Sequence, residues 1–89
     1  MNAVVLDTVG RACPWPLIEL GRALRSLRPG TQVLLLADDP VVLTDVPAWC
    51  AMVGGQLVRT DHEAADIRML IRLPGEPPAA TQQPPAASR

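Results

Sequence analysis

Hydrophobic and polar positions along this chain fall into blocks whose spacing changes from one block to the next. The first block, 3–9, is short, apolar and rich in Val, which favours a strand that ends near Asp7. Residues 14–28 change to helical spacing, and one face of that helix carries leucines three or four residues apart: Leu17, Leu20, Leu24 and Leu27. The pattern predicts a strand and then an amphipathic helix that Pro29-Gly30 ends.

The next two blocks repeat this order. Residues 31–37 form an apolar run short enough for a buried strand, and the turn 38–40 follows, where Asp39 is expected to cap a helix. A second stripe at helical spacing ends at Gly54-Gly55, and its members are Val42, Leu43, Val46, Trp49, Cys50 and Val53. Because Pro47 lies within the stripe, either Thr44 caps a helix with Pro47 in its first turn or one longer helix bends at Pro47.

The last apolar segments predict a hairpin, with strands at 56–60 and 66–73 joined by the polar turn 61–65. The element order is therefore β-α-β-α-β-β. Strand–helix–strand units favour parallel neighbours, and a closing hairpin adds antiparallel ones. Each helix has a single apolar stripe, so we expect an α/β (α+β) two-layer sandwich: a mixed four-stranded sheet with two helices on one face.

Composition divides the 89 residues into two parts. Residues 1–73 contain all the predicted elements and form one small domain. Residues 74–89 hold five of the ten prolines and no apolar residue larger than Ala. Such a segment buries too little surface to offset the entropy of ordering it, so we expect a disordered Pro/Ala/Gln-rich tail.

Charge and cysteine content restrict the function classes. Eight arginines and nine acids give a net charge of −1, which disfavours direct contact with nucleic acid. The chain has neither the roughly 20 successive apolar residues of a membrane span nor a recognisable signal peptide. Two cysteines do not form a disulfide framework, so we expect a cytoplasmic protein with reduced thiols and no membrane partner.

Cys13 is the main candidate for chemistry. We expect it at the N-cap of the first helix, with Pro14 as the first helical residue. The helix terminus and nearby Arg11 would then lower the thiol pKa, while Pro14 and Pro16 hold the loop in one geometry. The alternative is a buried cysteine that packs as a small apolar residue. The residues alone leave both interpretations open.

The remaining pattern limits what such a thiol could do. The segment CPWP lacks a second cysteine at C-x-x-C spacing, which disfavours thioredoxin-type exchange. The single histidine, His62, falls in the predicted turn 61–65 and is expected to be solvated rather than a catalytic base. No zinc-ligand spacing and no Gly-rich phosphate loop is present, so neither a metal nor a cofactor is predicted. A thiolate without a base can still accept a group and pass it on, which suggests a carrier.

The segment LDTVGRACPWP resembles the D-x-x-G-x-x-C-P-x-P signature of the TusA/SirA family of sulfur-carrier proteins. The residues at the signature positions are Asp7, Gly10, Cys13, Pro14 and Pro16. The segments ADDP at 37–40, TDVPAWC at 44–50 and IRMLIRL at 67–73 are also similar, so the resemblance covers about residues 4–73. It implies a sandwich of the same β-α-β-α-β-β order.

The resemblance also implies a function. Cys13 would take sulfane sulfur as a persulfide from a cysteine desulfurase or a rhodanese-like donor, and would pass it to a cysteine of an acceptor protein, a sulfurtransferase activity. Members of the family serve 2-thiouridine formation in tRNA, molybdenum-cofactor synthesis or sulfur oxidation. Arg11, Trp15 between the prolines, and Gly54-Gly55 depart from common family patterns, so the pathway stays open. The alternative is a regulatory or RNA/protein-binding module of the same fold.

Two apolar residues near Cys13 suggest where a partner docks. Trp15 and Ile18 fall on the helix side opposite the leucine stripe, so we expect both to be largely exposed and to form a docking surface. The alternative is that Trp15 folds over the loop and shields Cys13. Arg22, on the same side, belongs either to a solvated helix face or to the docking surface.

Two other side chains, those of Cys50 and Asp7, are expected to have structural roles. Cys50 is expected to pack in the core, with a second redox thiol as the alternative. Asp7 either hydrogen-bonds the local backbone as a turn residue or tunes Cys13, and we favour the turn.

Overall fold

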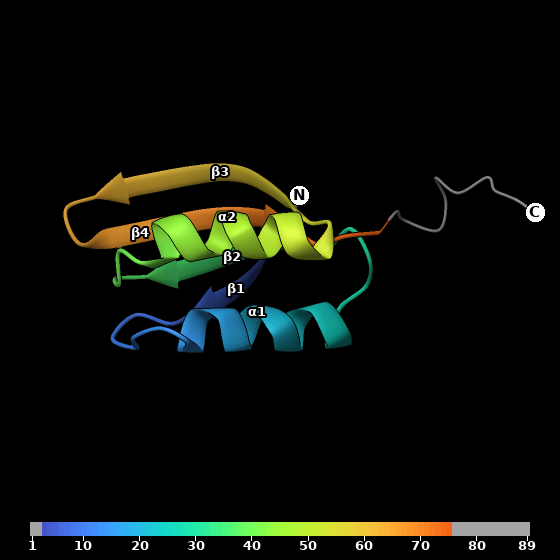
Figure 1. Cartoon of the computed structure of the whole chain (residues 1–89), viewed down its shortest axis with the longest axis horizontal. Coiled ribbons are helices and arrows are strands. Elements are labelled where there is room, and N and C mark those ends of the chain that lie inside the picture. Colours follow the sequence, from blue (N-terminus) through green and yellow to red (C-terminus); the bar gives the residue numbers. More distant parts are fainter. Residues whose placement is uncertain (1–2, 76–89) are drawn as a thin grey trace, which may run out of the picture.

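The computed structural model describes residues 3–75. The predicted tail, apart from Pro74 and Gly75, lies outside these residues. The element order is the predicted one, as Figure 1 shows: β1 (Val4–Asp7), α1 (Trp15–Ser26), β2 (Gln32–Ala37), α2 (Val42–Val53), β3 (Gln56–Glu63) and β4 (Asp66–Arg72).

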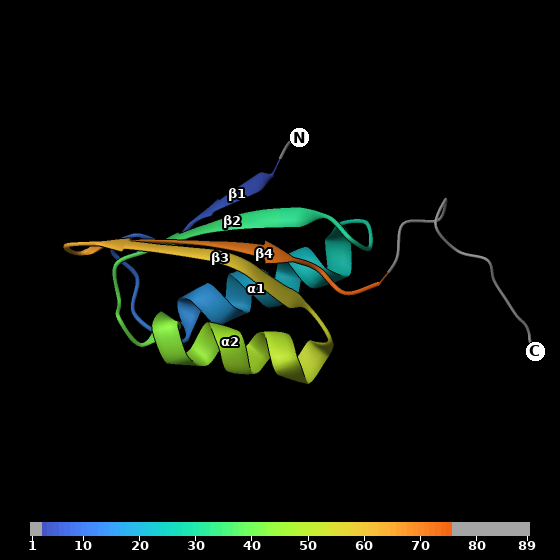
Figure 2. The ribbon, with the colours of Figure 1, turned by 90° about the horizontal axis from the view of Figure 1, so that it is seen from above.

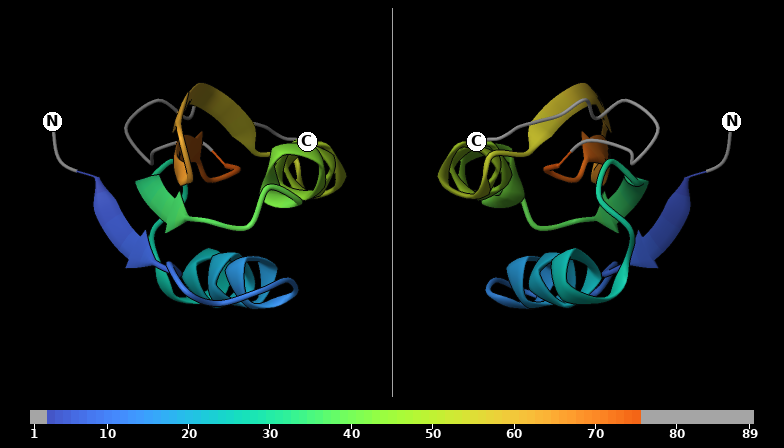
Figure 3. Two further views of the ribbon diagram at one scale, coloured as in Figure 1. Left: turned by 90° about the vertical axis from the view of Figure 1, so that its left-hand side faces the viewer. Right: turned by 90° about the vertical axis from the view of Figure 1, so that its right-hand side faces the viewer.

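The four strands form one mixed sheet in the order β1-β2-β4-β3. β1 and β2 are parallel, and β4 runs antiparallel to both of its neighbours, β2 and β3. Both helices cover the same face of this sheet (Figures 2 and 3), which confirms the predicted two-layer sandwich. β4 lies between β2 and β3, so those two strands are parallel without being adjacent.

The core lies between the sheet and the two helices. Leu20 of α1 and Val46 of α2 are fully buried there, against the inner face of the strands. In β2, burial alternates: Val33 and Leu35 are fully buried, whereas Leu34 between them is only partly buried. The prediction of a buried strand therefore holds for one face, because both helices pack on that face and successive side chains of a strand point to opposite faces.

The second helix resolves the two alternatives that Pro47 raised. α2 is a single helix from Val42 onward with Pro47 inside it, and no side chain caps its start. The expected cap, Asp39, instead accepts a 3.1 Å hydrogen bond from the N–H of Val41 in the preceding turn. Gly54, with φ of +82°, ends the helix as predicted, in the left-handed conformation that glycine adopts without strain.

The hairpin is longer than the sequence pattern indicates. β3 extends to Glu63, so the turn consists of Ala64 and Ala65. His62 lies in β3 opposite Ile67, and the prediction that it lies in the turn is wrong. Ladder hydrogen bonds join backbone groups, so pairing continues through polar residues whose side chains are exposed.

No helix among residues 3–75 is long and apolar enough to cross a membrane.

Candidate functional site

Cys13 is exposed in the loop 8–14, which connects β1 to α1. The start of this loop is fixed to the sheet. The backbone N–H and the hydroxyl of Thr8 both donate hydrogen bonds to the carbonyl of Leu36, at 2.8 and 2.7 Å, and Thr8 is fully buried. The carbonyl of Thr8 in turn accepts the N–H of Arg11 at 3.0 Å. These hydrogen bonds fix the position of Thr8, the residue at which the loop leaves the sheet.

Aspartates hold the rest of the loop. Asp7 accepts the N–H of Val9 at 3.0 Å, so it acts as the turn residue that the sequence favours. Asp38, which follows β2, accepts the N–H of Gly10 at 3.0 Å. β1 and β2 are parallel, so their carboxyl ends share one edge of the sheet, where the two following loops meet.

Cys13 contacts two further aspartates from a different part of the chain. Its N–H donates to Oδ2 of Asp39 at 3.1 Å, and its Sγ donates to Oδ2 of Asp45 at 3.3 Å. Asp39 lies in the turn after β2, and Asp45 lies in the first turn of α2. The thiol is thus positioned by the turn after β2 and by the first turn of α2, and not by its own loop alone.

Cys13 lies one residue further from the helix than predicted. The first helical hydrogen bond runs from the N–H of Ile18 to the carbonyl of Pro14, at 3.0 Å, so Pro14 and not Cys13 is the N-cap. The Cys13–Pro14 peptide bond is cis. Pro16 is buried at the start of α1, whereas Pro14 is exposed.

The prediction that the pKa of the Cys13 thiol is lowered is wrong. The hydrogen bond to Asp45 raises the pKa of Cys13, and desolvation and the negative charges of Asp45 and Asp39 act in the same direction. The guanidinium of Arg11 lies instead over the ring of Trp15, 4.9 Å from the ring centroid. The resting side chain is therefore a neutral thiol that donates to a carboxylate.

The second cysteine has a different environment. Cys50 is 3% exposed and packs in the core with Val46 and Trp49, as predicted. Burial raises the pKa of its thiol. Cys50 is accordingly a packing residue, and Cys13 is the accessible thiol of the described residues.

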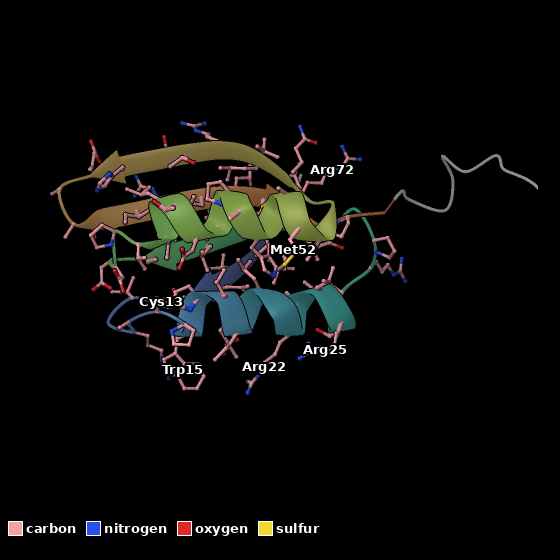
Figure 4. All side chains as sticks on the ribbon, in the orientation of Figure 1. Cys13, Trp15, Arg22, Arg25, Met52 and Arg72 are labelled. Carbon is pink, nitrogen blue, oxygen red and sulfur yellow. The ribbon has the colours of Figure 1, made fainter. Side chains whose placement is uncertain are left out.

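The apolar residues near Cys13 are exposed, although less fully than expected. Trp15 and Ile18 are each 39% exposed, and Cys13 is open to solvent, so Trp15 does not shield it. Figure 4 shows Trp15 and Arg22 on the side of α1 that faces away from α2. Arg22 lies 3.7 Å from a carboxylate oxygen of Glu19 on the same exposed helix face.

Two hollows adjoin the site. One, of about 340 Å³, is lined by Gly10, Arg11, Ala12, Asp38, Asp39 and Pro40. The other, of about 270 Å³, is lined by Leu17, Asp45, Ala48, Trp49 and Met52. No group of three metal-ligating side chains occurs among the described residues.

Sequence reasoning missed Asp38 and Asp45 as site residues and gave Asp39 a different role. The signal was present, because two strands joined by a helix run parallel, so the loops that follow them lie at the same edge of the sheet. That rule predicts that the turn 38–40 lies next to the loop that carries Cys13. The position of Asp45 additionally requires the orientation of α2, which the sequence pattern does not give.

Comparison with known proteins identifies the family. The family model described as Sulfurtransferase TusA matches residues 4–73. The structure is also similar to that of a SirA-like protein from Desulfitobacterium hafniense, with a TM-score of 0.70 and 23% sequence identity over 81% of this chain and 99% of that one. The structural likeness supports the fold, and the family match spans every element described above. The chain therefore belongs to the TusA family of sulfurtransferases.

Proposed function

We propose that this protein is a sulfur carrier that accepts sulfane sulfur as a persulfide on Cys13 and passes it to a cysteine of an acceptor protein. One observation carries this assignment within the family. Of the two cysteines, Cys13 is exposed on a fixed loop, whereas Cys50 is 3% exposed in the core. A carrier must present its sulfur to two successive partners, and only Cys13 meets this requirement without unfolding.

The chemistry requires no cofactor. In loading, a bond forms between Sγ of Cys13 and the outer sulfur of the donor's persulfide, while the donor's own S–S bond breaks. The donor leaves as a thiol that carries the proton lost by Cys13. In delivery, an acceptor thiolate attacks the same outer sulfur and Cys13 is released. Both steps are exchanges between sulfur atoms and need no oxidant.

The donor that we propose is a cysteine desulfurase or a rhodanese-like protein, and it docks beside Cys13 on the exposed face of α1 formed by Trp15, Ile18 and Arg22. Tryptophan is enriched among residues that dominate binding energy. Trp15 is two residues from the thiol and is stacked on Arg11, which limits its motion. The pathway that the carrier serves, whether tRNA thiolation, molybdenum-cofactor synthesis or sulfur oxidation, and its cytoplasmic location stay predictions.

Intact-mass measurement tests the assignment. The protein is incubated with a cysteine desulfurase and cysteine, and its mass is recorded without reductant. We expect one added sulfur in the wild type and in Cys50→Ala, and none in Cys13→Ser. Sulfur that still adds to Cys13→Ser would show that Cys13 is not the carrier residue.

A further inference from the structure

The carboxylate that contacts the sulfur comes from the opposite helix. Asp45 is 32 residues from Cys13 in sequence, and its Oδ2 is the acceptor of the thiol at 3.3 Å. Asp45 belongs to none of the ion pairs found among residues 3–75. Its negative charge is therefore not neutralised by a neighbouring arginine there, and it acts directly on the sulfur.

We infer that Asp45 holds unloaded Cys13 as a neutral thiol and promotes release of sulfur from the loaded form, an inference that rests on the proposed carrier function. The unloaded thiol has a proton to donate to Asp45. A thiolate at the same place would face the carboxylate with no hydrogen between the two, and like charges disfavour such an arrangement. The same contact is the largest cause of the raised pKa of Cys13.

The loaded form loses the favourable contact. An S–S bond is about 2.05 Å long, so the outer sulfur lies at most about 5.4 Å from Oδ2 of Asp45 if that oxygen does not move. Sγ no longer carries a proton. A persulfide is a stronger acid than a thiol, so near neutral pH its outer sulfur is negatively charged and is repelled by the carboxylate. Asp45 thus stabilises the empty carrier relative to the loaded one.

The other charged groups around Cys13 act in the same direction or are engaged elsewhere. Asp39, from the turn after β2, accepts the N–H of Cys13 and adds a second negative charge. Arg11, from the loop itself, lies over Trp15. Of the two aspartates, Asp45 is the one in contact with the sulfur atom, so its charge has the larger effect.

Release is balanced in atoms and electrons. The acceptor thiol loses its proton to solvent, and its sulfur bonds to the outer sulfur of the persulfide. The bond between that sulfur and Sγ of Cys13 breaks, and its electron pair stays on Sγ. Sγ of Cys13 then takes a proton from solvent, and the re-formed thiol donates a hydrogen bond to Asp45 again. The acceptor becomes a persulfide anion, and no net oxidation or reduction occurs.

Two measurements test this inference, both in a Cys50→Ala background so that Cys13 is the single thiol. The first is the rate of alkylation of Cys13 by iodoacetamide as a function of pH. We expect a midpoint above the ~8.5 of a free cysteine in the parent, and a lower midpoint in Asp45→Asn. Asp45→Glu, which keeps the charge, should retain a raised midpoint. The matched control is Asp61→Asn, which removes a carboxylate from β3, at the sheet edge opposite β1, and should leave the midpoint unchanged.

The second measurement is the exchange equilibrium with glutathione persulfide and glutathione, followed by intact mass. Asp45→Asn should hold a several-fold larger ratio of loaded to empty protein than the parent and release sulfur to glutathione several-fold more slowly. An unchanged alkylation midpoint, or a loaded ratio no larger than that of the parent, overturns the inference. A parent protein that loads neither from glutathione persulfide nor from a desulfurase overturns the proposed function itself, and alkylation still reports separately on the contact with Asp45.

Discussion

The backbone N–H of Cys13 donates a 3.1 Å hydrogen bond to Oδ2 of Asp39, a residue 26 positions later in the chain. The other oxygen of that carboxylate accepts the N–H of Val41, also at 3.1 Å. One side chain thus joins the loop that carries the thiol to the turn that leads into α2. These two hydrogen bonds hold the pKa of Asp39 below its ordinary value.

The pKa of Asp39 predicts a pH dependence of stability. Because the folded pKa is lowered, the ionised carboxylate stabilises the fold above the unfolded value of about 3.9, and this contribution is lost as pH falls through the lower folded value. Asp39→Asn should therefore reduce the decline in unfolding free energy on acidification below about pH 4. Urea unfolding across that range measures it, with Asp66→Asn in the hairpin as control. Identical acid profiles for Asp39→Asn and wild type would contradict this role.

Gly10 provides a test of backbone conformation near the thiol. Its φ is +84°, and an added Cβ would meet no atom within 4 Å, so strain and not crowding decides the effect. Gly10→Ala should cost about 1 kcal/mol of stability, and Gly10→Asn less, since Asn adopts positive φ more readily. Gly21→Ala in α1 is the control: its Cβ has only an ordinary 3.7 Å contact, and better helix propensity should raise stability by about 0.5–1 kcal/mol. Thermal unfolding measures the stability of these three variants. A larger loss of stability in Gly21→Ala than in Gly10→Ala would refute this account.

Leu20 tests the contact of α1 with the core. It is fully buried, whereas Ile18, two residues earlier, is 39% exposed. Leu20→Ala should lower the unfolding free energy by about 3 kcal/mol through lost burial and a residual cavity. Ile18→Ala should lower it by less than about 1 kcal/mol. Denaturant unfolding of the two variants measures the contrast, and similar losses would mean that the assigned inner face of α1 is incorrect.

Trp15 tests the docking surface. Because Trp15 is exposed, Trp15→Ala should leave stability within about 1 kcal/mol of the wild type. If the sulfur donor docks there, the variant should load several-fold more slowly from a cysteine desulfurase, while alkylation of Cys13 by iodoacetamide stays near normal. The control is Val58→Ala, an exposed apolar residue at an irregularity of β3. Equal loading rates for Trp15→Ala and Val58→Ala would exclude docking through Trp15.

Local sequence is enough to predict the element order, the inner face of each helix and the exposure of Trp15 and Ile18. These features depend on the spacing of apolar residues within one segment, so a short window contains the information. The end of α2 at Gly54 is equally predictable, because the left-handed conformation at a helix end is a local requirement that glycine meets. The cysteine signature is also a local pattern, and it is sufficient to name Cys13 as the candidate carrier residue.

The environment of the thiol, by contrast, depends on the tertiary structure. A local argument considers the helix terminus and Arg11 and predicts a lowered pKa for Cys13. The fold places Arg11 over Trp15 and brings Asp39 and Asp45 to the thiol from 26 and 32 residues away, so the pKa is raised instead. The position of β4 between β2 and β3 is likewise absent from the pattern. Strand pairing and the approach of charged groups depend on which segments meet in space, and the spacing of residues within a segment does not encode that.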